Sequence, residues 1–305
     1  MCSRTISNSM TNDAGNRRAA IIDIGSNSIR YMEAVQTGHG LCFSPKQVYT
    51  TRLAEGLPAT GMLSERRMAQ SLDVLCTLAH AAASAGAPAF AYATSAVRDA
   101  GNREAFLARV FERTGLRVRV LDGAEEAAFA FAGATGATGG GLIDIGGGST
   151  QIVTAAYRQS WPLGCVRLKE LCPGATLPDI RKTALPLLQA TIAPPPLHTE
   201  PWTAVGGTAT TLAALSLRLT SYDPAAVSGC RMRTAQLPTL LDRLDGMGER
   251  GRRMQPLLSE RHDVILYGGT ILAFAVALLG IDTLRFSDAD GMEGYAAVCL
   301  GTAQA

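Results

Sequence analysis

The stretch of sequence that decides the fold reads Ile22-Asp23-Ile24-Gly25-Ser26-Asn27-Ser28. It recurs 121 residues later as Ile143-Asp144-Ile145-Gly146-Gly147-Gly148-Ser149, in the same order of an apolar residue, Asp, Ile, Gly, two small residues and Ser. Each copy ends an apolar run that predicts a buried strand. Small residues after a strand let backbone N–H groups approach an anion without obstruction by a Cβ atom. The repeat therefore predicts two loops that act as the two jaws of one phosphate site.

Length and composition indicate an α/β protein of two lobes. At 305 residues the chain exceeds a typical single domain, so two lobes of about 120 to 170 residues are expected. Hydrophobic residues make up 47% and charged residues 18%, which is typical of a folded, enzyme-like protein. The net charge of +2 gives no indication of nucleic-acid binding, although a local basic groove for a long polyanion is compatible with it.

The cysteines and the apolar runs predict a cytoplasmic protein with no membrane contact. Seven scattered cysteines include no Cys-x-x-Cys pair and no zinc-type spacing, so we expect reduced thiols. Residues 1–18 are polar and lack the apolar core of a secretory signal, which indicates a disordered tail. The most apolar run, residues 271–279, is far shorter than the roughly twenty residues of a membrane span.

Hydrophobic periodicity and turn residues predict the remaining elements. Residues 29–35 and 151–156 predict strands that leave the two loops, so each loop is the turn of a β-hairpin. A helix is expected over residues 64–85, with Ser64 as its N-cap and Gly86 after its end. Further strands are predicted over residues 89–93, 116–120, 161–170, 203–205 and 283–287, and further helices over residues 102–114, 178–190 and 209–219, from residue 271 (after Gly268-Gly269-Thr270) and from residue 292.

The glycines at positions 133 to 141 mark a flexible join between the lobes. After the tail at residues 1–18, we place an N-terminal lobe at residues 19–132 and a C-terminal lobe at residues 133–305. The last helix belongs to the second lobe by sequence, with packing back on the first lobe as an alternative.

The carboxylates of the two loops predict a metal ion. Asp23 and Asp144 stand at strand ends beside the expected phosphate, which they would repel unless a cation intervenes. Mg²⁺ is commonly held by one or two carboxylates together with phosphate oxygens and water. We therefore predict Mg²⁺ with Asp23 and Asp144 as its ligands.

Five successive stretches resemble the motifs of the exopolyphosphatase and guanosine pentaphosphate phosphatase family. They are Asp23-Ile24-Gly25-Ser26-Asn27-Ser28-Ile29-Arg30, Ala93-Thr94-Ser95-Ala96-Val97-Arg98, Gly123-Ala124-Glu125-Glu126-Ala127, Asp144-Ile145-Gly146-Gly147-Gly148-Ser149-Thr150 and Gly206-Gly207-Thr208. The resemblance runs in order through nearly the whole chain and is to the short form of the family. It implies two actin-like (ribonuclease H-like) lobes, each a mixed sheet with helices, with a cleft between them, as in the superfamily of actin, sugar kinases and heat-shock chaperones.

The resemblance also implies an activity and its residues. It implies Mg²⁺-dependent release of terminal phosphate from inorganic polyphosphate or of the 5′ phosphate of guanosine pentaphosphate, so the expected partners are polyphosphate or guanosine penta- or tetraphosphate, and a homodimer is left open. In similar proteins the second Glu of the pair activates the attacking water, which here is Glu126, whereas Glu125 is an ordinary acid of the helix start. Arg98, with Arg30, would neutralise phosphate oxygens. The other predicted phosphate-binding residues are Gly25, Ser26, Asn27, Ser28, Gly146, Gly147, Gly148, Ser149, Gly206, Gly207 and Thr208.

Two positions depart from the family pattern. The family usually has Glu after Gly-Gly-Gly-Ser-Thr, and this chain has Gln151. Near the C-terminus the family commonly has Gly-Leu-Arg-Glu-Gly, whereas residues 290–294 read Asp-Gly-Met-Glu-Gly, so that Glu293 and Gly294 remain and the Arg is missing.

Two alternative functions stay open at this point. The two loops alone would serve ATP equally well in a kinase or a chaperone-like ATPase, although the pair Glu125-Glu126 favours the hydrolase. A sensor that binds guanosine tetraphosphate or polyphosphate without turnover is the other alternative, and Gln151 is the residue that favours it.

Overall fold

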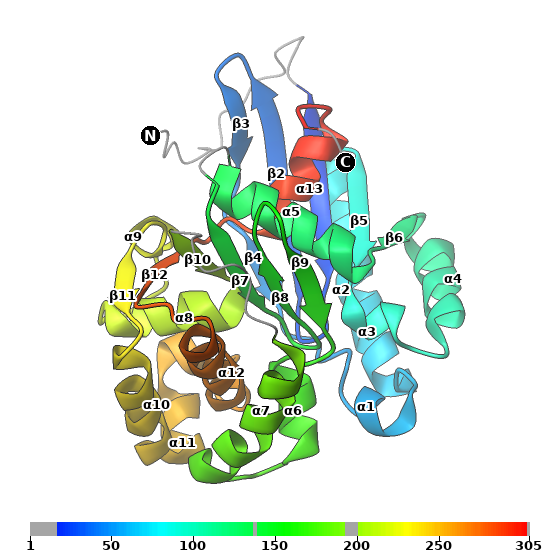
Figure 1. Cartoon of the computed structure of the whole chain (residues 1–305). Helices are drawn as coiled ribbons and strands as arrows, with labels where there is room; N and C mark the ends of the chain where they lie inside the picture. The colour runs from blue at the N-terminus through cyan, green and yellow to red at the C-terminus, as the bar shows by residue number, and fades with distance from the viewer. Residues whose placement is uncertain (1–16, 137–138, 193–200, 304–305) are drawn as a thin grey trace. The chain divides into compact units, whose positions relative to one another are not determined.

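The computed structural model describes residues 17–136, 139–192 and 201–303 and shows an α/β protein with two sheets of six strands each (Figure 1). The chain divides into two compact units. The first consists of Met1–Phe129 together with Gly291–Ala305, and the second is Ala130–Asp290. Most of the tail predicted for residues 1–18 lies outside the described residues.

The sheet of the first unit has the strand order β3-β2-β1-β5-β6, with β4 paired to β2. Strands β1, β2 and β3 run antiparallel, whereas β1, β5 and β6 run parallel. The strands of this unit are β1 (Arg18–Ile24), β2 (Ile29–Thr37), β3 (Gly40–Phe43), β4 (Gln47–Tyr49), β5 (Ala89–Ala93) and β6 (Val118–Val120). Its helices are α1 (Leu57–Thr60), α2 (Glu65–Ser84), α3 (Ser95–Arg98), α4 (Arg103–Thr114), the first part of α5 (Gly123–Thr135), and α13 (Gly291–Cys299).

The sheet of the second unit has the order β11-β12-β10-β7-β8-β9. The apolar helix α12 packs against α6, α7, α8, α10 and β7, which explains why it is apolar all round. The strands are β7 (Gly141–Ile145), β8 (Thr150–Val153), β9 (Arg158–Trp161), β10 (Trp202–Val205), β11 (Arg231–Arg233) and β12 (Thr283–Phe286). The helices are α6 (Cys165–Leu171), α7 (Leu177–Thr191), α8 (Gly206–Ser216), α9 (Pro224–Val227), α10 (Gln236–Gly246), α11 (Gly248–Met254), η2 (Pro256–Leu258) and α12 (Ile265–Leu278).

The two predicted hairpins are confirmed, and they repeat each other in register. Within the hairpin β1–β2, Asp23 lies opposite Arg30, and within β7–β8, Asp144 lies opposite Gln151. The turn is closed in both copies by the same bond, from Gly25 N to Ser28 O at 3.1 Å and from Gly146 N to Ser149 O at 2.9 Å. The sequence repeat is therefore a repeat of structure at the level of single hydrogen bonds.

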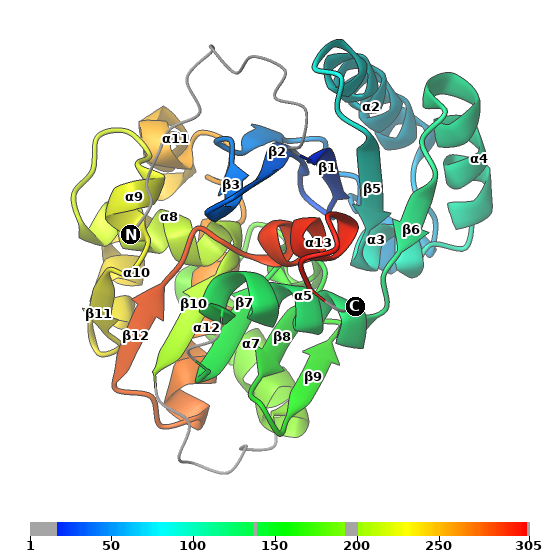
Figure 2. The same ribbon diagram turned by 90° about the horizontal axis from the view of Figure 1, so that it is seen from above.

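The C-terminal helix α13 packs on the sheet of the first unit. It lies along β1 and β2 (Figure 2). Its Tyr295 ring packs against the tilted ring of Tyr92, at 4.7 Å between ring centroids, and makes an edge-to-face contact with Phe129 at 5.3 Å. A Cβ atom on Gly294 would lie 2.1 Å from the carbonyl oxygen of Phe129. Glycine at position 294 is therefore required for the close approach of α13 to α5.

A buried ion pair fastens α13 to the same unit. Lys46 Nζ lies 3.0 Å from Glu293 Oε1, and both side chains are only 10% exposed. Removing one partner of a buried pair takes away compensation for the charge that remains, so we expect Glu293→Gln to lower the free energy of unfolding by about 3 kcal/mol. Urea unfolding measures this change. The matched control is Glu104→Gln in the exposed pair with Arg103, which is expected to change little, and equal midpoints for the two variants would contradict the prediction.

Most predicted elements are confirmed within a few residues, with α2 as the clearest case. Its N-cap Ser64 accepts a hydrogen bond from Arg67 N, and Gly86 follows the helix with a φ of 62°. The chain has no helix, among the described residues, that is both long and apolar enough to span a membrane. The cysteines of the described residues are all free thiols, as predicted.

Three predicted boundaries are wrong. Residues 161–170 are not a strand, because β9 ends at Trp161 and α6 begins at Cys165. The helix expected after Thr270 begins already at Ile265, since Gly268 and Gly269 lie inside it against Thr208 and Leu241. Helix α8 begins at Gly206 and not at residue 209. In all three cases glycines that suggest a turn serve close packing instead.

Candidate active site

The first loop is bound to the segment that carries Arg98. The side chains of Ser26 and Ser95 share a hydrogen bond of 2.9 Å between their hydroxyl oxygens, and Thr94 N donates to Ile24 O at 3.3 Å. Both serines are buried. The fold therefore places the first two predicted motifs in direct contact within the first unit.

Two of the predicted site residues in this loop bind each other. The guanidinium of Arg30 donates from Nε and Nη2 to Asp23 Oδ2, at 2.8 and 2.5 Å, across the hairpin. The Asp23 side chain is only 6% exposed, so this guanidinium compensates a buried charge. Asp23 was predicted as a metal ligand and Arg30 as a phosphate ligand, and in the structure each of them bonds to the other.

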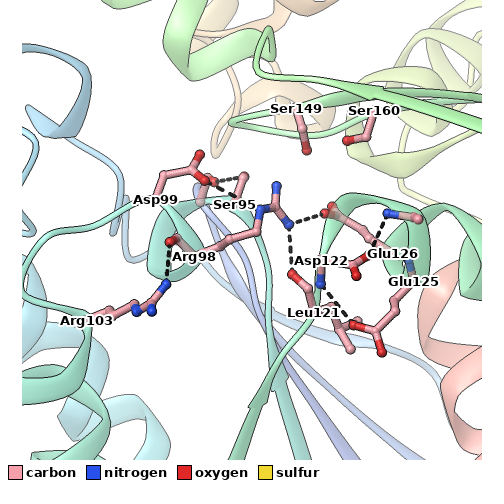
Figure 3. Close-up of polar contacts among 12 residues, drawn as sticks. Ser95, Arg98, Asp99, Arg103, Leu121, Asp122, Glu125, Glu126, Ser149 and Ser160 are labelled. Carbon is pink, nitrogen blue, oxygen red and sulfur yellow. Dashed lines mark hydrogen bonds and ion pairs between the residues drawn. The ribbon is translucent and has the colours of Figure 1, made fainter.

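Arg98 and Glu126 form an ion pair at the start of α5 (Figure 3). Arg98 Nη1 lies 3.1 Å from Glu126 Oε2 and donates to Leu121 O at 2.9 Å, while Arg98 Nε lies 3.5 Å from Asp99 Oδ1. The Glu126 side chain remains 16% exposed and that of Arg98 22%. The structure thus brings together the two residues predicted as catalytic, and fixes both orientations.

The neighbouring Glu125 has a different task, because it closes the N-terminus of α5. The side chain of Asp122 accepts hydrogen bonds from Ala124 N and Glu125 N, both at 2.8 Å, and Glu125 Oε2 accepts from Asp122 N at 3.0 Å. This reciprocal pattern is a capping box. Glu125 also pairs with Arg119. One acid of the pair is therefore engaged in the helix cap, and the other carries the partly exposed carboxylate beside Arg98.

The second loop is held by the N-terminus of α6. Cys165 N donates to Gly146 O at 3.0 Å, and Val166 N donates to Gly147 O at 2.8 Å. Because the C=O and N–H of a trans peptide point in opposite directions, the N–H groups of Gly147 and Gly148 point away from α6. Such adjacent N–H groups suit an anion.

Gly164 makes this arrangement of the second loop sterically possible. A Cβ atom on Gly164 would lie 2.5 Å from the carbonyl carbon and oxygen of Gly147, and 2.6 Å from Gly146 O. Gly164 belongs to none of the motifs that predict the site. Its signal in the sequence is weak, since a glycine before a helix is usually an ordinary cap.

The stretch Gly206-Gly207-Thr208 begins α8, and its first glycine lies beside Asp144. Gly206 has a φ of 84°, and a Cβ atom there would lie 2.6 Å from Asp144 Oδ1. A Cβ atom on Gly207 would overlap the guanidinium of Arg261, whose Cζ atom lies 2.1 Å from that point. The N-terminus of α8 thus lies between a carboxylate and a guanidinium. Arg261 stands in no motif and was missed by the sequence reasoning.

The buried Cys165 is excluded as a nucleophile. Its burial raises the pKa of the thiol to about 11, against an opposing effect of Arg261. A thiolate is needed for nucleophilic attack, so this thiol is unreactive near neutral pH.

Gln151 lies opposite Asp144 and contacts the second loop. Its Nε2 donates to Ser149 Oγ at 2.9 Å and to Ser160 Oγ at 3.2 Å, and the residue is 1% exposed. Its Oε1 is buried and accepts no hydrogen bond from the described residues. Gln151 therefore orients the hydroxyl of Ser149, and its Oε1 is an available acceptor on the residue directly opposite Asp144 in the hairpin.

These oxygen atoms fit the predicted Mg²⁺. No group of three or more His, Cys, Asp or Glu side chains that could hold a metal occurs in the described parts of the chain. Mg²⁺ does not need such a group, because phosphate oxygens and water complete its shell. Asp144 and the buried Oε1 of Gln151 are suitable oxygen donors in the second unit. In the first unit Asp23 bonds to Arg30 through Oδ2, whereas its Oδ1 is buried and accepts no hydrogen bond from the described residues, so this oxygen is also a suitable donor.

Comparison with known proteins places the chain in a family. The sequence model of the Ppx/GppA phosphatase family matches residues 34–298. The chain is 34% identical to exopolyphosphatase 2 of Mycobacterium tuberculosis over 93% of this chain and 99% of that protein. The structure of the Aquifex aeolicus PPX-GPPA enzyme has a TM-score of 0.76 at 28% identity, covering 93% of this chain and 99% of that one. An exopolyphosphatase from Cytophaga hutchinsonii shares the fold at a TM-score of 0.81 and 20% identity, with 94% and 99% coverage. The chain belongs to the Ppx/GppA phosphatase family and has the fold of that family, with two six-stranded sheets and their helices.

Proposed function

We propose that this protein is a phosphohydrolase that releases terminal phosphate from inorganic polyphosphate, with Mg²⁺ as its cofactor. The observation that carries the proposal is the pairing of Arg98 with Glu126 beside the first loop, while Glu125 is engaged in the helix cap. The names of the relatives, which are exopolyphosphatases, support the same substrate class.

In the proposed reaction Glu126 accepts a proton from the attacking water. A carboxylate that is held in place but partly exposed is suited to this task, since general bases act through water within hydrogen-bond reach. Arg98 has two tasks, because its guanidinium orients Glu126 and matches the geometry of phosphate oxygens.

The second unit supplies groups that bind phosphate. The N–H groups of Gly147 and Gly148, the hydroxyl of Ser149 and the N-terminus of α8 at Gly206-Gly207-Thr208 form donors for phosphate oxygens. Asp144 and Gln151 would hold Mg²⁺, which supplies charge neutralisation for the phosphate oxygens. Phosphoryl transfer depends mostly on such positioning and charge neutralisation.

The test is phosphate release from long-chain polyphosphate with purified protein, with and without Mg²⁺ and EDTA. We expect release with Mg²⁺ and a loss on EDTA treatment that added Mg²⁺ reverses. The same assay with guanosine pentaphosphate, which the family name permits as a second substrate, determines the preference. No release from either substrate above a Glu126→Gln control would overturn the proposal.

Gln151 favours one alternative, a sensor that binds without turnover. Gln151 is buried and uncharged, so it does not repel a phosphate group bound at the second loop as a carboxylate would. It also lacks the negative charge with which a carboxylate would bind the metal ion needed for hydrolysis, so the substitution favours binding over turnover. Tight binding of polyphosphate by calorimetry, without product, would select this alternative.

A further inference from the structure

Two arginines have a left-handed backbone. Arg52 has a φ of 51° and Arg218 a φ of 57°, and among the described residues only these two non-glycine residues have a positive φ. This conformation is unfavourable for a residue with a Cβ atom, and for a long side chain it requires an explanation. The explanation differs between the two arginines.

Arg218 is explained by the end of a helix. It is the residue after Leu217, the C-cap of α8. Arg218 N donates to Leu215 O at 3.1 Å, and Leu219 N donates to Ala214 O at 3.0 Å. Helices commonly end with a residue in the left-handed conformation at this position. The Arg218 side chain is exposed, and the helix end alone explains the left-handed backbone at this residue.

Arg52 lies in a segment that is bound to the first phosphate loop. Arg52 N donates to Asn27 O at 2.8 Å, and Ala54 N donates to Ser26 O at 3.0 Å. Thr51, Leu53 and Ala54 are buried, with exposures of 4% or less, whereas Arg52 between them remains partly exposed. No helix precedes Arg52, since the preceding element is the strand β4. The segment therefore holds Arg52 rigidly beside the loop.

Polar atoms collect at this contact. Asn27 Oδ1 and Thr51 Oγ1 are both buried and make no hydrogen bond to the described residues. Buried polar atoms of this kind are normally satisfied by water or by a ligand. The hydroxyl of Thr51 and the guanidinium of the next residue, Arg52, are donors of the kind that a phosphate group requires, on a segment whose backbone is bonded to the glycine loop.

We propose that Arg52 is a substrate-binding residue whose guanidinium binds a phosphate group of the polyphosphate chain at the first loop. Arg30 at the same loop is bonded to Asp23, and Arg52 adds a second arginine on the segment whose backbone is bonded to this loop. The strained backbone is retained because the surrounding hydrogen bonds fix it at a binding site, as strained residues often are. This inference rests on the proposed function for the identity of the ligand.

The experiment compares Arg52→Gly with Arg218→Gly. Glycine adopts the left-handed backbone without strain, so both variants are expected to keep or raise the melting temperature. Arg52→Gly is expected to raise KM for long-chain polyphosphate about tenfold, because a lost charge-assisted hydrogen bond has this effect, with a smaller change in kcat. Arg218→Gly is expected to keep the KM of the wild type. Arg52→Asn, which also tolerates this backbone, is the second variant.

Binding of polyphosphate by calorimetry gives a readout that does not depend on turnover. Weaker binding to both Arg52 variants, with unchanged binding to Arg218→Gly, supports the inference even if the wild type releases no phosphate and the proposed function fails. Wild-type KM and affinity in folded Arg52→Gly and Arg52→Asn would overturn it. A drop in melting temperature without a change in affinity would also overturn it, because Arg52 would then be structural.

Discussion

Replacing Glu126 with Gln is expected to lower kcat for polyphosphate by roughly 10²- to 10⁴-fold, the usual contribution of a general base. Gln has the same shape but cannot accept the proton of the attacking water. Arg98 keeps its bonds to Leu121 O and Asp99, so the variant is expected to remain folded with a similar melting temperature. Initial rates of phosphate release at saturating substrate measure the change.

The adjacent acid provides the matched control. Glu125→Gln is expected to keep kcat within about twofold, because Gln also serves in a capping box. Glu125→Ala removes the box, and we expect it to lower the free energy of unfolding by about 1 kcal/mol without loss of the chemical step. If Glu125→Gln lost activity as strongly as Glu126→Gln, the division of tasks between the two acids would be refuted.

Gly164→Ala is expected to lower kcat/KM by about 10²-fold, although residue 164 carries no functional group. Its backbone, with φ −129° and ψ 177°, is one that alanine adopts readily, so the effect comes only from the collision of the new methyl group with Gly146 and Gly147. The methyl group must displace the second loop from α6, and a displacement of about 1 Å at a binding loop has effects of this size. Steady-state kinetics on polyphosphate measure it.

Gly246→Ala is the control for this glycine substitution. Gly246 is the last residue of α10, and a Cβ atom there meets nothing within 4 Å. Activity is expected to stay at the wild-type level, with a small gain in stability from the better helix propensity of alanine. Full activity in Gly164→Ala would mean that the second loop tolerates the displacement, and the proposed donors at Gly147 and Gly148 would have to be abandoned.

The repeat of seven residues was sufficient to predict the two hairpins, because the same local chemistry produces the same hairpin twice. Apolar residues before Asp23 and Asp144 become buried strands, and the small residues after them allow the tight turn closed at Gly25 and Gly146. The helix α2 could be predicted equally well from the sequence, since its cap Ser64 and the glycine after its end, Gly86, are local signals. The capping box of Asp122 and Glu125 is also readable from sequence, and it distinguishes the two acids.

Residues whose role depends on tertiary contacts could not be predicted. Arg261 lies over Gly207 although 54 positions separate them, and no pattern in the sequence connects the two. The helix α6 was predicted as a strand, because the sequence before it offers no side-chain cap that would signal a helix start. The first N–H groups of α6 are satisfied instead by carbonyl groups of the second loop, which lie nearby only in the folded chain. The bond between Arg30 and Asp23 was missed for a related reason, since the pairing requires the hairpin register.

The register of the two hairpins has an electrostatic consequence. Arg30 and Gln151 occupy equivalent positions of the repeat, each opposite the aspartate of its own hairpin. The first copy carries its own counter-ion, so the charge of its aspartate is compensated within the hairpin. The second copy has a neutral amide at that position, so the charge of Asp144 gains no compensation from its cross-strand neighbour. One position of the repeat therefore decides where the counter-charge comes from: the first hairpin supplies it from its own second strand, whereas in the second hairpin it must come from outside the hairpin, from another element of the chain or from solution.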